Sequence, residues 1–95
     1  EKAHQRGIKV FGATVTPFKG NNYSRGNHEE GRAALNEWIR TSDVFDGVID
    51  FDAMVRDSED PLRLDPSFLF ENDWLHLNAK GYEKMGKGID IRLFR

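Results

Sequence analysis

The sequence predicts an α/β protein built around a parallel β-sheet. Two short apolar segments rich in β-branched residues indicate strands, and each is followed by a segment with helical spacing. This alternation of strands and helices over 95 residues is typical of βαβ units, in which helices cover parallel strands. The composition, 38% hydrophobic and 32% charged, suits a soluble globular protein.

The first element expected is the end of a helix. Residues 1–6, EKAHQR, are polar and compatible with a helix, which Gly7 would terminate. Residues 8–15 follow as the first strand, and their nearly continuous apolar character predicts burial on both faces. The content of Pro, Gly, Asn and Ser makes residues 16–27 a loop.

The spacing of apolar residues predicts a helix over residues 28–41. Asn27 followed by Glu30 resembles a capping box at its start. We expect one buried stripe on this helix, with Trp38 in the core. The stripe would consist of Ala34, Leu35, Trp38 and Ile39.

The second half of the chain begins with a short strand over residues 48–51. One helical turn is expected in DAMVRD, residues 52–57, and the two prolines and many acids make residues 56–72 a long irregular loop. Asn78 is expected to cap a final helix over residues 79–91. One face of that helix would carry Tyr82, Met85, Ile89 and Leu93.

Several classes of function are disfavoured by the bulk sequence. The net charge of −2 shows no excess of basic residues, so no nucleic-acid partner is expected. There are no cysteines, which excludes disulfides and thiolate chemistry. No apolar run approaches the ~20 residues that span a bilayer, and His4 and His28 lack a metal-binding spacing, so no metal is expected.

Two strands are too few for an independent parallel sheet. A two-stranded ribbon leaves both edges unpaired and covers little of the apolar surface of two helices. We therefore expect the chain to pack against further sheet, from an N-terminal part of the same protein or from another chain.

Asp73 and His76 form the candidate site. An imidazole exchanges a proton near neutral pH, and a carboxylate bonded to one ring nitrogen fixes the tautomer. In a helical turn the three-residue spacing brings both side chains to the same side, which would supply a general base and its orienting acid. The alternative is structural, because Asp is favoured near helix starts and a lone His often packs at a surface.

The wider stretch resembles a known family. Residues 73–82, DWLHLNAKGY, are similar to the last conserved block of the SGNH, or GDSL, esterase and lipase superfamily, with Asp, His, Asn, Gly and Tyr in register. The upstream segments GATVTPF, LNEWIR and FDGVIDFDAMVRD resemble the branch that includes carbohydrate acetylesterases. The resemblance covers about residues 7 to 94.

The resemblance implies a fold and an activity. The fold is a three-layer α/β/α, flavodoxin-like sandwich with a parallel sheet, of which residues 1–95 would be the C-terminal segment. The activity is ester hydrolysis by a serine nucleophile without metal or cofactor, on an acetylated carbohydrate or a short acyl ester. Carried over by position, His76 is the general base and Asp73 its orienting acid. The resemblance also favours an extracellular or periplasmic location.

The nucleophile of that family lies in a Gly-Asp-Ser block, which these residues lack. None of the four serines, Ser24, Ser42, Ser58 and Ser67, has that context. We expect the N-terminal part of the enzyme or a second chain to supply the nucleophile, and little esterase activity from the 95 residues alone. The alternative is a non-catalytic truncated domain that associates through its sheet edge as an intertwined homo-oligomer.

Other residues are weaker candidates. Trp74 lies between Asp73 and His76 and is expected to pack beneath them or to edge the substrate pocket. Tyr23 follows a strand's carboxyl end and is a candidate for substrate contact, against the alternative of an ordinary solvated loop.

Asp50 and Asp52 flank the end of the second predicted strand. They are candidates for orienting a sugar or binding a cation. The alternative, which we favour, is a turn signal.

Overall fold

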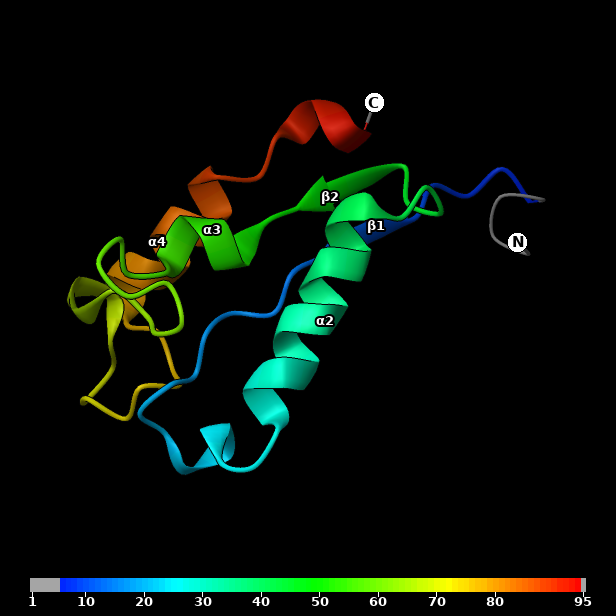
Figure 1. Cartoon of the computed structure of the whole chain (residues 1–95). Helices are drawn as coiled ribbons and strands as arrows, with labels where there is room; N and C mark the ends of the chain where they lie inside the picture. The colour runs from blue at the N-terminus through cyan, green and yellow to red at the C-terminus, as the bar shows by residue number, and fades with distance from the viewer. Residues whose placement is uncertain (1–5, 95) are drawn as a thin grey trace.

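The described residues, 6–94, form a small α/β structure in the computed structural model (Figure 1). Its sheet has two parallel strands, with Gly12 opposite Val48, which confirms the predicted α/β class and parallel pairing. Both strands are shorter than predicted. The helix expected over residues 1–6 falls almost wholly outside the described residues. In chain order the elements are β1 (Phe11–Ala13), η1 (Asn22–Ser24), α2 (His28–Thr41), β2 (Gly47–Ile49), α3 (Phe51–Val55), η2 (Pro66–Phe68), α4 (Ala79–Lys87) and η3 (Ile91–Phe94).

The start of α2 differs from the sequence prediction although its bounds agree. Asn27 has φ −103° and ψ 22° and makes no side-chain capping bond. A capping side chain reaches the first amides from extended backbone, which Asn27 does not adopt. The predicted capping box is therefore wrong, and the carbonyl of Asn27 accepts the first helical bond from Gly31.

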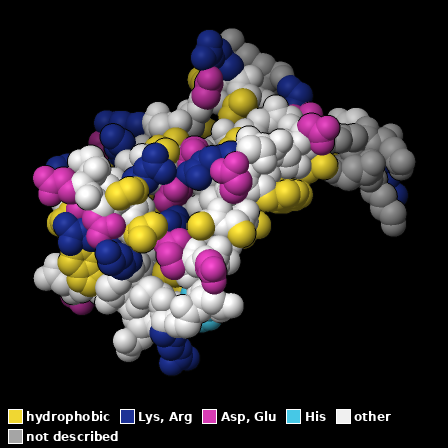
Figure 2. Space-filling view, in the orientation of Figure 1, with side chains coloured by type: hydrophobic (Ala, Val, Ile, Leu, Met, Phe, Trp, Pro, Cys, Tyr) yellow, Lys and Arg dark blue, Asp and Glu magenta, His cyan; other side chains and the backbone are white. Residues whose placement is uncertain are grey.

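The buried face of α2 is polar. Arg32, Asn36 and Ile39 are its buried residues, whereas Leu35 is 45% and Trp38 52% exposed. The predicted apolar stripe is wrong except at Ile39. Figure 2 shows hydrophobic side chains along α2, beside the charged side chains that gather near the ends of the strands.

Hydrogen bonds to the backbone beyond β1 explain why α2 buries this face and not the predicted apolar one. Just beyond β1, the amide of Val15 donates to the side-chain oxygen of Asn36 at 2.7 Å, and the Asn36 amide donates to the Val15 carbonyl at 2.9 Å. A partly buried peptide group gains free energy from hydrogen-bond partners, and Asn36, which is 1% exposed, faces the chain there to supply them. That orientation turns Leu35 and Trp38 outward.

The sheet is only partly covered within the described residues. Gly12 is buried, Ala13 is exposed and β2 is half-buried throughout. The predicted burial of both strand faces is therefore wrong here. The cover is local: a Cβ on Gly12 would lie 3.1 Å from Ile39, and one on Gly47 would lie 2.7 Å from Leu93.

The hydrophobic core lies beyond the carboxyl ends of the strands, around α3 and α4. The long segment predicted as irregular contributes to it and makes an antiparallel bridge between Arg56 and Leu64. The core therefore supports the chain that leads to the candidate site. Its buried members are Val55, Leu64, Leu69 and Leu77, with Met54, Phe68, Trp74 and Met85 packed against them.

The predicted cap of the last helix is confirmed. The Asn78 side-chain oxygen accepts from the amide of Gly81 at 2.9 Å. The helix ends at Lys87 rather than residue 91, so Ile89 and Leu93 lie beyond it and the predicted common face is wrong, and Tyr82 is 57% exposed. Gly88 forms the C-cap, and a Cβ there would lie 2.5 Å from the sulfur of Met54 in α3. No helix in the described part of the chain is long and apolar enough to span a bilayer.

Candidate functional site

The candidate site is a turn held above the core. Leu69 and Leu77 pair as an antiparallel bridge and are both buried. Inside this bridge the amide of Phe70 donates to the His76 carbonyl at 3.0 Å, and the amide of Asp73 donates to the Phe70 carbonyl at 3.3 Å. Hydrogen bonds within the turn and the two buried leucines therefore hold the backbone on both sides of Asp73 and His76.

The structure brings Asp73 and His76 into direct contact. The His76 Nδ1 lies 2.7 Å from Asp73 Oδ2. The other carboxylate oxygen, Oδ1, accepts from the amides of Leu75 and His76, each at 2.9 Å. The Leu75 amide, then the His76 amide and imidazole, lower the pKa of Asp73 to about 2. The carboxylate is thus ionised at neutral pH.

This contact determines which imidazole nitrogen is available. An ionised Asp73 only accepts hydrogen bonds, so Nδ1 of His76 donates and the neutral ring carries its lone pair on Nε2. The His76 side chain is 63% exposed, and no residue in the described range makes a hydrogen bond to Nε2. A proton acceptor therefore faces outward from the turn.

The turn has unusual backbone angles. Glu71, Asn72 and Trp74 have φ of 52°, 59° and 59°, in the left-handed region that costs a non-glycine residue about 1 kcal/mol or more. A distant contact stabilises it: Asn21 Nδ2 donates to the Asp73 carbonyl at 2.8 Å. Sequence analysis missed Asn21, and its only signal was the turn-forming content of the loop.

Trp74 packs against the loop after β1, the loop that also contains Asn21. It is half-buried, it packs against the core cluster, and Arg63 Cζ lies 5.2 Å from its ring centroid. A Cβ on Gly20 would lie 2.8 Å from Trp74 Cγ, so only glycine fits there. Trp74 does not line the hollow that contains His76, and its contact with substrate stays a prediction.

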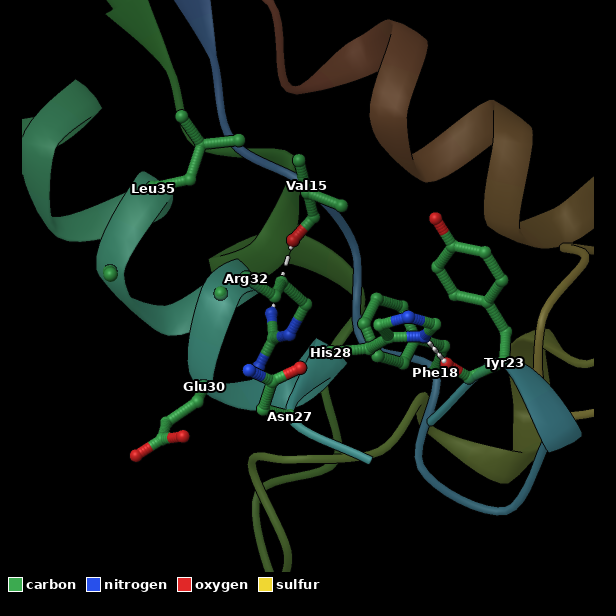
Figure 3. A pocket seen from close by; sticks show the side chains of 10 residues that line it. Val15, Phe18, Tyr23, Asn27, His28, Glu30, Arg32 and Leu35 are labelled. Atoms are coloured by element: carbon green, nitrogen blue, oxygen red, sulfur yellow. Dashed lines mark hydrogen bonds between the residues drawn. The ribbon is translucent and has the colours of Figure 1, made fainter. Parts of the chain in front are cut away.

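Tyr23 lies on a different part of the surface. It is 57% exposed, packs edge-on against Phe18 at 5.1 Å and lies 4.9 Å from the His28 ring. Figure 3 shows Tyr23 beside Phe18, His28 and Val15 in a hollow that contains neither Asp73 nor His76. Tyr23 shares a shallow groove with Leu75, and its contact with substrate stays a prediction.

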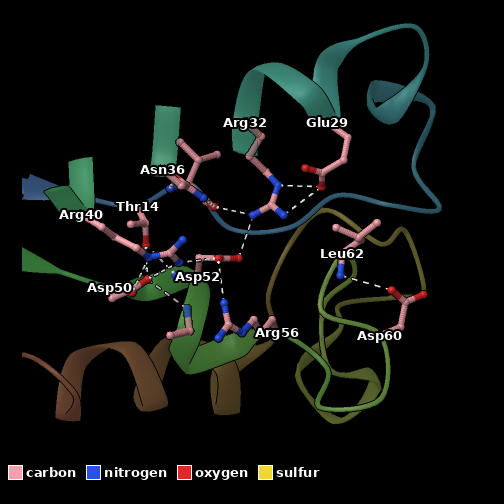
Figure 4. Close-up of polar contacts among 12 residues, drawn as sticks. Thr14, Glu29, Arg32, Asn36, Arg40, Asp50, Asp52, Arg56, Asp60 and Leu62 are labelled. Atoms are coloured by element: carbon pink, nitrogen blue, oxygen red, sulfur yellow. Dashed lines mark hydrogen bonds and ion pairs between the residues drawn. The ribbon is translucent and has the colours of Figure 1, made fainter. Parts of the chain in front are cut away.

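Asp52 is the centre of a buried cluster of charges (Figure 4). Its carboxylate accepts from Arg32 Nη1 and Arg40 Nη2, each at 2.7 Å, and from Arg56 Nη1 at 3.3 Å. Its amide donates to the hydroxyl of Thr14 at 2.9 Å. These contacts join the end of β1, α2 and α3.

Asp50 belongs to the same cluster. It accepts from Arg40 at 2.8 and 2.9 Å and from the Ala53 amide at 3.2 Å, which caps α3. The Arg40 guanidinium holds the pKa of Asp50 at about 2. Both carboxylates thus have structural partners, which agrees with the turn reading and leaves neither aimed at a ligand. No group of acidic and histidine side chains within residues 6–94 is arranged to hold a metal ion.

The sequence matches the model of a known protein family. Residues 1–84 match the GDSL-like lipase/acylhydrolase family, a stretch that includes Asp73 and His76. A search of curated proteins found no match. Since the family match covers most of the chain, the protein belongs to the GDSL-like lipase/acylhydrolase family.

Proposed function

We propose that this member of the GDSL-like acylhydrolases acts in carboxylic ester hydrolysis, with His76 as general base and Asp73 as its orienting acid. The observation that supports the proposal is the 2.7 Å contact between His76 Nδ1 and Asp73 Oδ2, which leaves Nε2 exposed. A base that acts on a nucleophile must be both oriented and accessible, and this pair is both.

The chemistry assigned to the pair has two proton transfers. His76 Nε2 accepts the proton of a serine hydroxyl as its oxygen attacks the ester carbonyl, and then donates it to the departing alcohol oxygen. Water repeats the cycle on the acyl-serine and releases the acid. Asp73 remains ionised and stabilises the imidazolium, a role that suits a carboxyl whose pKa is about 2.

The nucleophile is proposed to come from outside residues 1–95. The Gly-Asp-Ser block that the family resemblance requires is absent from this sequence. Two of the serines have other partners: Ser24 Oγ donates to the Asn21 carbonyl and Ser67 Oγ to Asp65. We assign the nucleophile and the oxyanion donors to an N-terminal part of the same enzyme or to a second chain.

The surface of α2 supports this division of the site. Leu35 and Trp38 are about half exposed, and the sheet has two strands among the described residues. Further strands and a covering layer would bury both features, as in a three-layer α/β/α sandwich. Residues 1–95 would then be the C-terminal segment of one hydrolase domain.

The proposed substrate is a short acyl ester. The resemblance of the upstream segments to carbohydrate acetylesterases makes an acetylated carbohydrate one candidate among such esters, and the surroundings of His76 decide between the candidates.

The function is tested by measuring p-nitrophenyl acetate hydrolysis. The sample is the protein in the form that its natural source produces. His76→Ala is expected to lower kcat/KM by about a thousandfold or more, because the general base is removed. His28→Ala is the matched control, an exposed histidine outside the pair, and is expected to change the rate less than about twofold. The 95-residue chain alone is expected to show little turnover. Full activity in His76→Ala would refute the proposal.

The exposed Trp38 and Leu35 also favour a second function, self-association without catalysis. In that case light scattering would show a discrete oligomer that Trp38→Lys dissociates, and no sample would hydrolyse p-nitrophenyl acetate. An oligomer that does hydrolyse the ester in a His76-dependent way would instead support the esterase proposal.

A further inference from the structure

A hollow lies directly beside the candidate general base. Its volume is about 600 Å³, enough for a small organic group. His76 itself lines this hollow, so a group bound at that end lies beside the reactive ring. Besides Asp73 and His76, it is lined by Phe70, Leu77, Asn78, Ala79 and Tyr82.

Apolar side chains form the walls of the hollow. Phe70 and Tyr82 are 51% and 57% exposed, and Leu77, which also lines the hollow, is buried in the core. Phe70 is held next to His76, because its amide donates to the His76 carbonyl at 3.0 Å. Two exposed aromatic rings gain free energy when an apolar ligand removes them from water.

The polar groups of the hollow are almost all engaged within the protein. Asn78 accepts from the Gly81 amide and donates to the carbonyls of Ser67 and Leu69. Both oxygens of Asp73 already accept hydrogen bonds.

Within the described residues, this leaves His76 Nε2 and the Tyr82 hydroxyl without hydrogen-bond partners. A sugar ring carries several hydroxyls, each of which needs a partner when it leaves water. The lining therefore favours an apolar group over a carbohydrate.

Proton transfer decides which end of an ester occupies the hollow. The imidazole that protonates the leaving group must lie within ~3 Å of the alkoxy oxygen. The substituent on that oxygen is the alcohol, so it lies against the imidazole. The carbonyl oxygen points instead to the oxyanion donors. The proposed function assigns those donors to a part of the enzyme outside residues 1–95.

We propose that the hollow between Phe70 and Tyr82 binds the alcohol portion of the ester, and that this alcohol is an apolar ring or alkyl group. The inference rests on the proposed function for the assignment to the alcohol side. It selects a short acyl ester of an apolar alcohol over an acetylated sugar.

Binding of alcohols to the naturally produced protein tests the ligand class without catalysis. Cyclohexanol is expected to shift the imidazole ¹H–¹³C resonances of His76 in NMR titrations, and methyl β-glucopyranoside at equal concentration is not. Phe70→Ala is expected to weaken cyclohexanol binding roughly fivefold, because one aromatic wall is lost. The matched control is Leu62→Ala, 43% exposed and outside the hollow, and it is expected to leave binding unchanged.

Tyr82 gives a second route if Phe70→Ala fails to fold. Tyr82→Ala is expected to weaken cyclohexanol binding by a similar factor, and Tyr82→Phe is expected to restore it, because the ring and not the hydroxyl makes the wall. Equal shifts with the glucoside, or no shift with cyclohexanol, would overturn the proposal.

An ester series tests the alcohol assignment in the naturally produced protein. Phe70→Ala is expected to lower the kcat/KM ratio of cyclohexyl acetate to ethyl acetate roughly fivefold, with little change in the ratio of ethyl butyrate to ethyl acetate. The reverse pattern would assign the hollow to the acyl chain and overturn the proposal. Full activity in His76→Ala would refute the proposed function instead, and the NMR titrations would still decide the ligand class.

Discussion

The side-chain amide of Asn21 donates to the carbonyl of Asp73 at 2.8 Å, across 52 residues of sequence. Asn21 lies in the loop after β1, and Asp73 lies in the turn before α4. The same Asn21 accepts from the Tyr23 amide at 2.9 Å, so its orientation is fixed from both ends. This bond joins the two halves of the chain at the candidate site.

Asn21→Ala is expected to loosen the turn that carries Asp73 and His76. A hydrogen bond of this kind contributes about 1 kcal/mol, and its loss leaves a half-buried carbonyl without its partner. Amide hydrogen exchange at Leu75 and His76 should accelerate roughly fivefold. Asn22→Ala is the control, an exposed neighbour of the same type. Equal acceleration in both variants would show that the bond to Asp73 does not hold the turn.

Asp73→Asn tests the orienting role under the proposed function. The new amide keeps the size of the side chain but favours the wrong imidazole tautomer, with Nε2 protonated. We expect kcat for p-nitrophenyl acetate to fall by up to about ten-thousandfold with a smaller change in KM. Asp43→Asn, an exposed change of the same kind, should leave kcat unaltered. A loss confined to KM would contradict a role in proton transfer.

The low pKa of Asp73 predicts acid sensitivity of the turn. Backbone amides lower this pKa from 3.8 to about 2, so Asp73 contributes stability above its unfolded pKa and loses that contribution as the pH falls from about 4 through about 2. The ¹³C carboxyl resonance of Asp73 should titrate with a midpoint near 2, and the Leu75 amide should exchange faster over the same pH range. A midpoint near 4 would show that the amide contacts are not maintained in solution.

Local sequence patterns predicted the bounds of the helices better than which helix face is buried. Apolar spacing gave the bounds of α2, and the Asn78 cap placed the start of α4. The face that α2 buries depends on Asn36 meeting the backbone of Val15, a contact between distant residues that helical periodicity does not contain.

The candidate site divides in the same way. The spacing of Asp73 and His76 predicted their contact, but the helical turn expected there is instead a non-helical turn with Trp74 at φ 59°. Tertiary contacts determine the left-handed backbone of Glu71 and Asn72 and the hydrogen bond from Asn21. No short sequence motif therefore predicts these features.

Asp52→Asn is expected to destabilise the whole chain. Arg32, whose side chain is 5% exposed, would lose its ion pair with Asp52 and keep only Glu29 as a charged partner while remaining buried. Removing one member of a buried ion pair costs about 3–5 kcal/mol, a large fraction of the stability of a small domain. Urea unfolding measures the loss, with the exposed Asp43→Asn as control. A loss below about 1 kcal/mol would mean that water reaches this cluster.

Gly20→Ala tests whether Trp74 fixes the loop against the turn. Gly20 has φ +99°, and a Cβ there would lie 2.8 Å from Trp74 Cγ. Gly26→Ala is the matched control, because Gly26 has φ +65° with nothing within 4 Å of its Cβ position. The control should lose about 1 kcal/mol from its backbone angle alone, and Gly20→Ala at least about 1 kcal/mol more from overpacking.

Urea unfolding of both variants, in a Trp38→Phe background that leaves Trp74 as the single tryptophan, measures the difference between them. Gly20→Ala alone should also shift the Trp74 emission, because the ring must move away from residue 20. Equal losses and unchanged emission would mean that Trp74 is free to move. The left-handed turn would then depend on the Asn21 bond and the Leu69–Leu77 bridge without this packing contact.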